Sequence, residues 1–127
     1  MATKQINVQR FNVTTSKPFK DVVAGLESKI GHLDMMAFRK NIIAAQTDSE
    51  LEKVIQAAPG SSGLMEFTCF DLGEVVRKEL GSRAPQSLRL AGNPVIIKQM
   101  VRFVPDAGSY APVTILVDER PDGVHIS

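Results

Sequence analysis

The sequence of 127 residues has a single cysteine, a single tyrosine and no tryptophan. One cysteine cannot form a disulfide within the chain, which excludes a secreted scaffold stapled by disulfides. Aromatic residues are few and are not interleaved with basic ones, which argues against a nucleic-acid module that stacks bases. The first five residues lack the apolar core of a signal peptide, and no apolar run is long enough to span a membrane. We therefore expect a cytoplasmic protein that binds neither nucleic acid nor membrane.

The chain also lacks a strong net charge, because 15 Lys and Arg residues are balanced by 14 Asp and Glu residues. The charges are distributed unevenly, however. Residues 71–104 carry six cations and three acids, whereas residues 105–127 carry one cation and four acids. Two local patches of opposite sign are typical of solvated faces, and they would also suit self-association or binding of a small anion.

No catalytic, metal-binding or cofactor-binding motif is present. The two histidines, His32 and His125, have no cysteine or histidine at zinc-ligand spacing. No serine occupies a nucleophile-elbow sequence, and neither the dinucleotide fingerprint nor the P-loop occurs. We therefore predict no catalytic residue, no metal and no cofactor, and whether the protein is an enzyme stays open.

The spacing of apolar residues predicts the order strand, three helices, strand, helix, strand, helix and terminal hairpin. The first half is expected to contain a strand over 6–14, a helix that Ser16 caps and that ends at a left-handed Gly31, a helix after Asp34 and a helix after the capping box 47–50. The second half is expected to contain a strand over 64–71, a short helix ending at Gly81, a strand over 88–91 and a helix after Asn93. Two strands around the turn 120–123 complete the chain. This order predicts a single α+β domain over 1–127. We expect a two-layer sandwich with a mixed, mostly antiparallel sheet and helices on one face.

The stretch Gly92-Asn93-Pro94 has two interpretations. Asn is a strong helix N-cap and Pro is favoured at the first helical position, so the stretch is explained as a strand-to-helix junction. Free N–H groups at a helix start also attract anions. On this second interpretation Asn93, with Arg89, Asp71 and Tyr110, would line a site for a small anionic ligand or an enzyme's substrate. The carboxylate of Asp71 also fits the plain role of capping the next helix.

Cys69 lies between aromatic residues on the predicted strand 64–71. Free cysteine is among the most buried residue types, and burial makes a thiol inert, so we expect a structural role. A sulfur-carrier role would require an exposed thiol with a cationic neighbour.

Two helices are expected within residues 33–62, and the first of them carries more apolar surface than one packing face needs. Met36 and Ile43 lie off its main stripe. Methionine adapts to irregular partners, so we predict that Met36 and Ile43 face a second molecule.

The second half of the chain resembles the domain of unknown function 302 family, also called TT-seventeen-fifty-one-like. The resemblance rests on the strand ending at Asp71, the Gly92-Asn93-Pro94 junction and the final segment APVTILVDERPDGVHIS. It covers residues 64–127 well and 6–30 acceptably, and it implies a small bacterial or archaeal α+β protein that is often dimeric. Members commonly lack a counterpart of residues 33–62, which we therefore interpret as a helical insertion. Many members have Asp-His-Ala where this chain has Asp71-Leu72-Gly73, so any role of that histidine is absent here.

Because no catalytic motif accompanies this resemblance, the leading hypothesis is a homodimeric binding or accessory domain. The alternatives are an anionic-ligand or enzyme site at the Gly92-Asn93-Pro94 junction and a sulfur carrier acting through Cys69.

Overall fold

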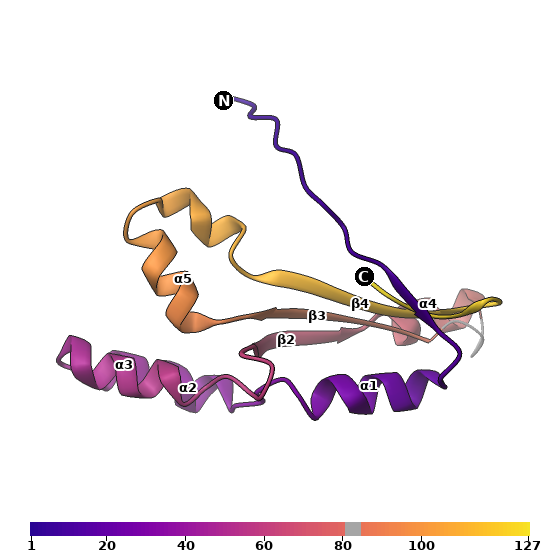
Figure 1. Cartoon of the computed structure of the whole chain (residues 1–127), viewed down its shortest axis with the longest axis horizontal. Coiled ribbons are helices and arrows are strands. Elements are labelled where there is room, and N and C mark those ends of the chain that lie inside the picture. Colours follow the sequence, from indigo (N-terminus) through magenta and orange to yellow (C-terminus); the bar gives the residue numbers. More distant parts are fainter. Residues whose placement is uncertain (81–84) are drawn as a thin grey trace.

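The computed structural model of the chain describes residues 1–80 and 85–127. Within these ranges, five strands form one open sheet in the order β1-β5-β4-β3-β2 (Figure 1). The strands are β1 Val13–Thr15, β2 Met65–Asp71, β3 Gln86–Gly92, β4 Val113–Arg120 and β5 Gly123–Ile126. All pairs of named strands are antiparallel, and a parallel contact occurs as an isolated bridge between Gly31 and Met65.

The helix α1, Phe19–Glu27, packs on one face of the sheet. Its buried Val22 contacts Val117 of β4 and Val124 of β5, and Phe19, Val23 and Leu26 pack around this cluster. In the register of the sheet, Val117 pairs with Ser87 and Ile115 pairs with Arg89. Because side chains of paired residues point to the same face, Ser87 and Arg89 also lie on the α1 side.

A second core cluster joins the next two helices, α2 Met35–Ala44 and α3 Asp48–Gln56, to the start of β2. Its buried members are Phe38, Ile55, Ala58 and Met65. Both predicted N-caps are confirmed. Asp34 accepts hydrogen bonds from the N–H groups that follow it, and Thr47 accepts one from the N–H of Glu50.

The remaining helices are α4 Leu72–Leu80, α5 Pro94–Val101 and the 3₁₀ helix η2 Pro105–Ser109. In Figure 1, α1, α2 and α3 lie below the sheet, whereas α5 rises from the end of β3 on the other side. The order of elements and the α+β fold therefore agree with the sequence prediction. The helical layer on one face consists of α1 to α3, and the sheet has only antiparallel pairs between its named strands.

The first strand is much shorter than predicted. The sequence predicts residues 6–14, but β1 covers only Val13–Thr15, and residues 1–12 are exposed and have no regular structure. The reason lies in the register, because Val13 pairs with Ile126, the last residue of β5. The residues before Val13 therefore extend past their partner strand, and in Figure 1 they rise away from the sheet.

Two predicted helix ends are also wrong. Ser16 does not cap α1, whose N-cap position is Pro18 and has no side-chain cap. Gly31 is not left-handed, since only Gly63 and Gly123 have positive φ among the described residues. Gly31 instead lies against the backbone of Ala58 and Gly60, where an added Cβ would come within 2.1 Å of the Ala58 carbonyl oxygen. The predicted helix end at Gly81 lies outside the described residues.

Among the residues that the structure describes, no helix is both long enough and apolar enough to cross a membrane.

Candidate functional site

The Gly92-Asn93-Pro94 stretch is the strand-to-helix junction that the sequence predicts. The Asn93 Oδ1 accepts hydrogen bonds from the N–H groups of Val95 at 2.9 Å and Ile96 at 3.1 Å. Its Nδ2 donates to the Gly63 carbonyl oxygen at 2.8 Å, which ties the start of α5 to the loop before β2. Since Asn93 itself occupies two N–H groups of the first turn, those donors are not free for an anion.

Arg89 is a buried charged residue of the sheet, with its side chain 2 % exposed. Its Nη2 lies 2.8 Å from Glu27 Oε1 on α1, and its Nε lies 3.1 Å from Glu66 Oε2 on β2. Its Nη1 also donates to the Ser87 hydroxyl. Two carboxylates therefore neutralise the guanidinium, and Arg89 links α1 to the sheet.

The other two predicted ligand residues lie elsewhere. Asp71 accepts a hydrogen bond from the Glu74 N–H at 2.9 Å and so caps α4. It pairs with Ser87, whereas Met65 at the other end of β2 pairs with Gly92. The two ends of β2 are therefore ~20 Å apart at the usual rise per residue. Tyr110 is exposed and follows η2, so the four predicted ligand-binding residues are spread over separate places.

A polar cleft of about 370 Å³ lies between α3 and α5, lined by Asp48, Glu52, Lys98, Gln99 and Arg102. The Lys98 Nζ lies 2.6 Å from both Asp48 Oδ1 and Glu52 Oε1. Hydrogen bonding to Asp48, and then to Glu52, raises the pKa of Lys98. Sequence reasoning missed this cluster because its acids and its lysine come from helices about fifty residues apart.

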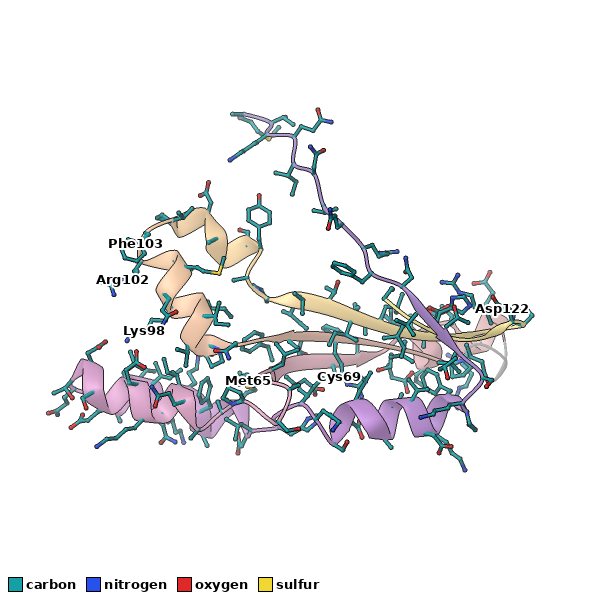
Figure 2. The ribbon with its side chains drawn as sticks, viewed as in Figure 1. Met65, Cys69, Lys98, Arg102, Phe103 and Asp122 are labelled. Atoms are coloured by element: carbon teal, nitrogen blue, oxygen red, sulfur yellow. The ribbon has the colours of Figure 1, made fainter. Side chains whose placement is uncertain are left out.

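Figure 2 shows Arg102 and Phe103 near this cleft at the end of α5, and the Arg102 guanidinium carbon lies 4.8 Å from the centre of the Phe103 ring. The cleft therefore carries Arg102, which lies over the Phe103 ring, beside a lysine whose charge is already paired with two carboxylates.

Cys69 is exposed, so the predicted burial is wrong. It lies on β2, the edge strand of the sheet, where Figure 2 labels it. Its partner in the ladder is Arg89, and its sulfur lies 3.8 Å from the Ser87 hydroxyl oxygen. Cys69 is exposed because α1 covers β4 and β5 and leaves this edge of the sheet open.

Large apolar side chains are exposed over much of the molecule. Met36 is 68 % exposed and Ile43 is 77 % exposed, as a role in binding a partner requires. Met100 in α5 and Val104 just after it are also exposed. Other exposed side chains are Ile6, Val8, Phe11, Val13, Phe70, Val75, Ile96, Phe103 and Val113.

These features describe an open α+β sheet protein with a strand-to-helix junction tied by Asn93, and the comparisons with known proteins assign its family. The family model "Domain of unknown function DUF302" matches residues 42–127. The chain belongs to the DUF302 family. The match begins within α2 and includes α3, so it extends into the segment that the sequence analysis treats as an insertion.

A solved structure supports the fold. The chain is similar to the crystal structure of an uncharacterized conserved DUF302 protein from Bacillus stearothermophilus, with a TM-score of 0.55 and 13 % identity over 91 % of this chain and 69 % of that chain. Among curated proteins, no relative matches.

Proposed function

We propose that this protein is a homodimeric binding or accessory domain. The observation that supports it is the exposed surface area. A folded monomer of 13.8 kDa is expected to expose about 6,600 Å². This chain exposes 9337 Å², a surplus of roughly 2,700 Å². Stable homodimers bury roughly 1,000–2,500 Å² on each partner, so the surplus is of the size that dimerisation removes.

The surplus is not confined to the exposed N-terminal residues. Residues 1–12 account for roughly 2,000 Å² if they are counted as unfolded chain, and the rest of the protein keeps a surplus of roughly 1,200 Å². On α2, Met36 and Ile43 are more than two-thirds exposed, and Met35 and Ile42 are each 37 % exposed. An apolar helix surface of this kind is typical of a protein interface, and we place Met36 and Ile43 in the dimer contact.

The test is the molecular mass in solution, measured by analytical ultracentrifugation over a range of concentrations. The native chain should sediment as a dimer. The double variant Met36→Glu with Ile43→Glu should sediment as a folded monomer, because each glutamate would place a charge in an apolar contact. A native chain that stays monomeric at high concentration would overturn the proposal.

The matched control is Asn41→Glu, which adds one negative charge to another exposed position of α2. It is compared with Ile43→Glu alone, so that both variants differ from the native chain by one charge on the same helix. Circular dichroism establishes that each variant is folded. Equal dissociation by both variants would indicate a general charge effect and would remove Ile43 from the interface.

A second function, as a sulfur carrier acting through Cys69, is supported by one observation. The thiol is exposed, as this role requires. Its partner in the ladder, Arg89, is a cation whose charge is already paired with Glu27 and Glu66. An exposed free thiol also suits a reducing compartment such as the cytoplasm, where we place the protein. The folded native protein should react with a thiol reagent at a rate close to that of a free cysteine peptide, and protection of more than about a hundredfold would exclude this role.

The anionic-ligand or enzyme site at Asn93 receives less support, because Asn93 uses its own carboxamide on the N–H groups of α5. A thermal shift on adding inorganic phosphate that is lost in Asn93→Ala would revive it.

A further inference from the structure

The N-terminal arm, defined as residues 1–12, combines features that are not expected of a free tail. Its apolar residues Ile6, Val8 and Phe11 are 46 %, 80 % and 80 % exposed. Ile6 and Val8 alternate as in a strand, Phe11 continues with Val13 on the opposite parity after a bulge, and β1 continues the arm directly. A tail that stays exposed to water is usually polar, because apolar side chains lower the free energy only when they are buried. The arm therefore has the composition of a strand that lacks a partner in its own chain.

The sheet offers a free edge for such a strand. β2 is an edge strand, and Gly31 bridges only its start, through hydrogen bonds with Leu64 and Glu66. Beyond this bridge no strand among the described residues lies beside the outer side of β2. An exposed edge of this length is a ready template for an added strand. Phe70 on this strand is 55 % exposed and supplies apolar surface there.

The arm cannot lie along β2 of its own chain. β1 and β2 are at opposite edges of the five-stranded sheet, so the edges are roughly 19 Å apart at the usual strand spacing. Crossing that distance takes about six extended residues, which would use the segment that carries Val8 and Phe11. A second copy of the chain is not subject to this limit.

Charge also favours the pairing. The arm carries Lys4 and Arg10 and has no acidic residue, whereas β2 has no basic residue and ends at the exposed Asp71; its other acid, Glu66, is already paired with Arg89. We propose that the arm of each protomer adds as a strand to the outer edge of β2 in a second copy of this chain. The inference rests on the proposed homodimer, and it identifies the segment that the two protomers exchange.

The single native cysteine makes a direct test possible, because Cys69 lies on β2 and is exposed. A variant with Val8→Cys and Cys69→Ser has its only thiol in the arm, and it is mixed with native protein, whose only thiol is on β2. Mild oxidation should produce a covalent heterodimer with a disulfide between position 8 of one chain and Cys69 of the other, identified by peptide mass. The control carries Lys53→Cys with Cys69→Ser, which places the thiol on an exposed position of α3. It should give less than about a tenth of that product.

A second measurement tests whether the arm contributes to dimer affinity. Val8→Glu with Phe11→Glu should raise the dimer dissociation constant at least ~tenfold, because two apolar side chains per arm lose their contact. The control Asn7→Glu with Asn12→Glu adds the same charge at polar positions of the arm and should leave the constant within about threefold of the native value.

The outcomes separate the two proposals. A native dimer that gives no heterodimer disulfide and is unaffected by the arm substitutions would overturn the arm exchange while the homodimer stands. A native monomer would overturn both.

Discussion

Apolar residues occupy five of the nine positions of α1 and seven of the ten positions of α2, and the two helices use them differently. On α1 the apolar residues lie along one stripe, and the helix buries Val22 against β4 and β5. On α2 they extend around the helix, so Phe38 is its single buried residue while Met36 and Ile43 are mostly exposed. A helix can bury only one face against one layer. The comparison shows that arrangement around the helix, more than apolar content, decides whether a helix is satisfied within its own chain.

The two helices also differ in polar anchoring. The end of α1 is tied to the sheet by the ion pair between Glu27 and the buried Arg89. The polar capping of α2 is local, because Asp34 accepts its hydrogen bonds from the first turn of the same helix. We therefore expect α2 to depend on Phe38 and, in the dimer, on its partner.

The largest expected effect comes from removing the anchor of α2. Phe38→Ala should lower the free energy of unfolding by about 3–5 kcal/mol, because it removes a buried aromatic ring and leaves a cavity in the core. Val22→Ala on α1 should cost about 2 kcal/mol, because fewer atoms are removed. Chemical denaturation measures both. Hydrogen exchange should show that Phe38→Ala releases the amides of α2 before those of α1, and an α2 that stays fully protected would contradict the comparison.

An intermediate effect is expected from the charge that anchors α1. Arg89→Ala should destabilise the protein by about 2–3 kcal/mol, because Glu66, whose side chain is 18 % exposed, loses its partner. Glu27→Gln should cost less than about 1 kcal/mol, since the Glu27 side chain is half exposed and screened by water. Denaturant titration of the two variants provides the measurement. If both variants lose the same free energy of unfolding, the stabilisation comes from the ion pair with Glu27 on α1 and not from the pairing of Glu66.

The smallest effect concerns the turn that joins β4 to β5, the two strands that α1 covers. A hydrogen bond from His125 to Asp122, at 2.7 Å, lowers the pKa of Asp122. Because the pKa of Asp122 is lower in the folded state than in the unfolded state, the hydrogen bond stabilises the fold at pH values above the unfolded pKa. This stabilisation is lost as the pH falls through the folded pKa. The native protein should therefore lose slightly more stability below about pH 4 than Asp122→Asn. Thermal unfolding at several pH values measures this difference, with Glu119→Gln, from the same hairpin, as the control for charge removal. A Glu119→Gln response equal to that of Asp122→Asn would contradict a specific role for the hydrogen bond.

Several local features could be predicted because neighbouring residues decide them. The caps at Asp34, Thr47 and Asn93 depend on a side chain and N–H groups two or three residues away. The turn before Gly123 depends on that glycine, whose positive φ other residues rarely adopt. The candidate site was less predictable. Arg89 was singled out, but its partners Glu27 and Glu66 are distant in the sequence. The division into one domain with a helical insertion over 33–62 stays a prediction.

The sequence by itself determined the order of the elements, the caps at Asp34, Thr47 and Asn93 and the surplus of apolar surface on α2, because propensity, periodicity and hydrogen bonding within a turn act over a few residues. Only the tertiary structure decided that the strand predicted over 6–14 pairs no further than Val13, that Cys69 is exposed and that Arg89 is buried between two carboxylates. Each of these depends on which strand lies beside which and where that neighbour ends. Strand order and register bring together residues that are far apart in the chain, and the pattern along one strand does not contain that information.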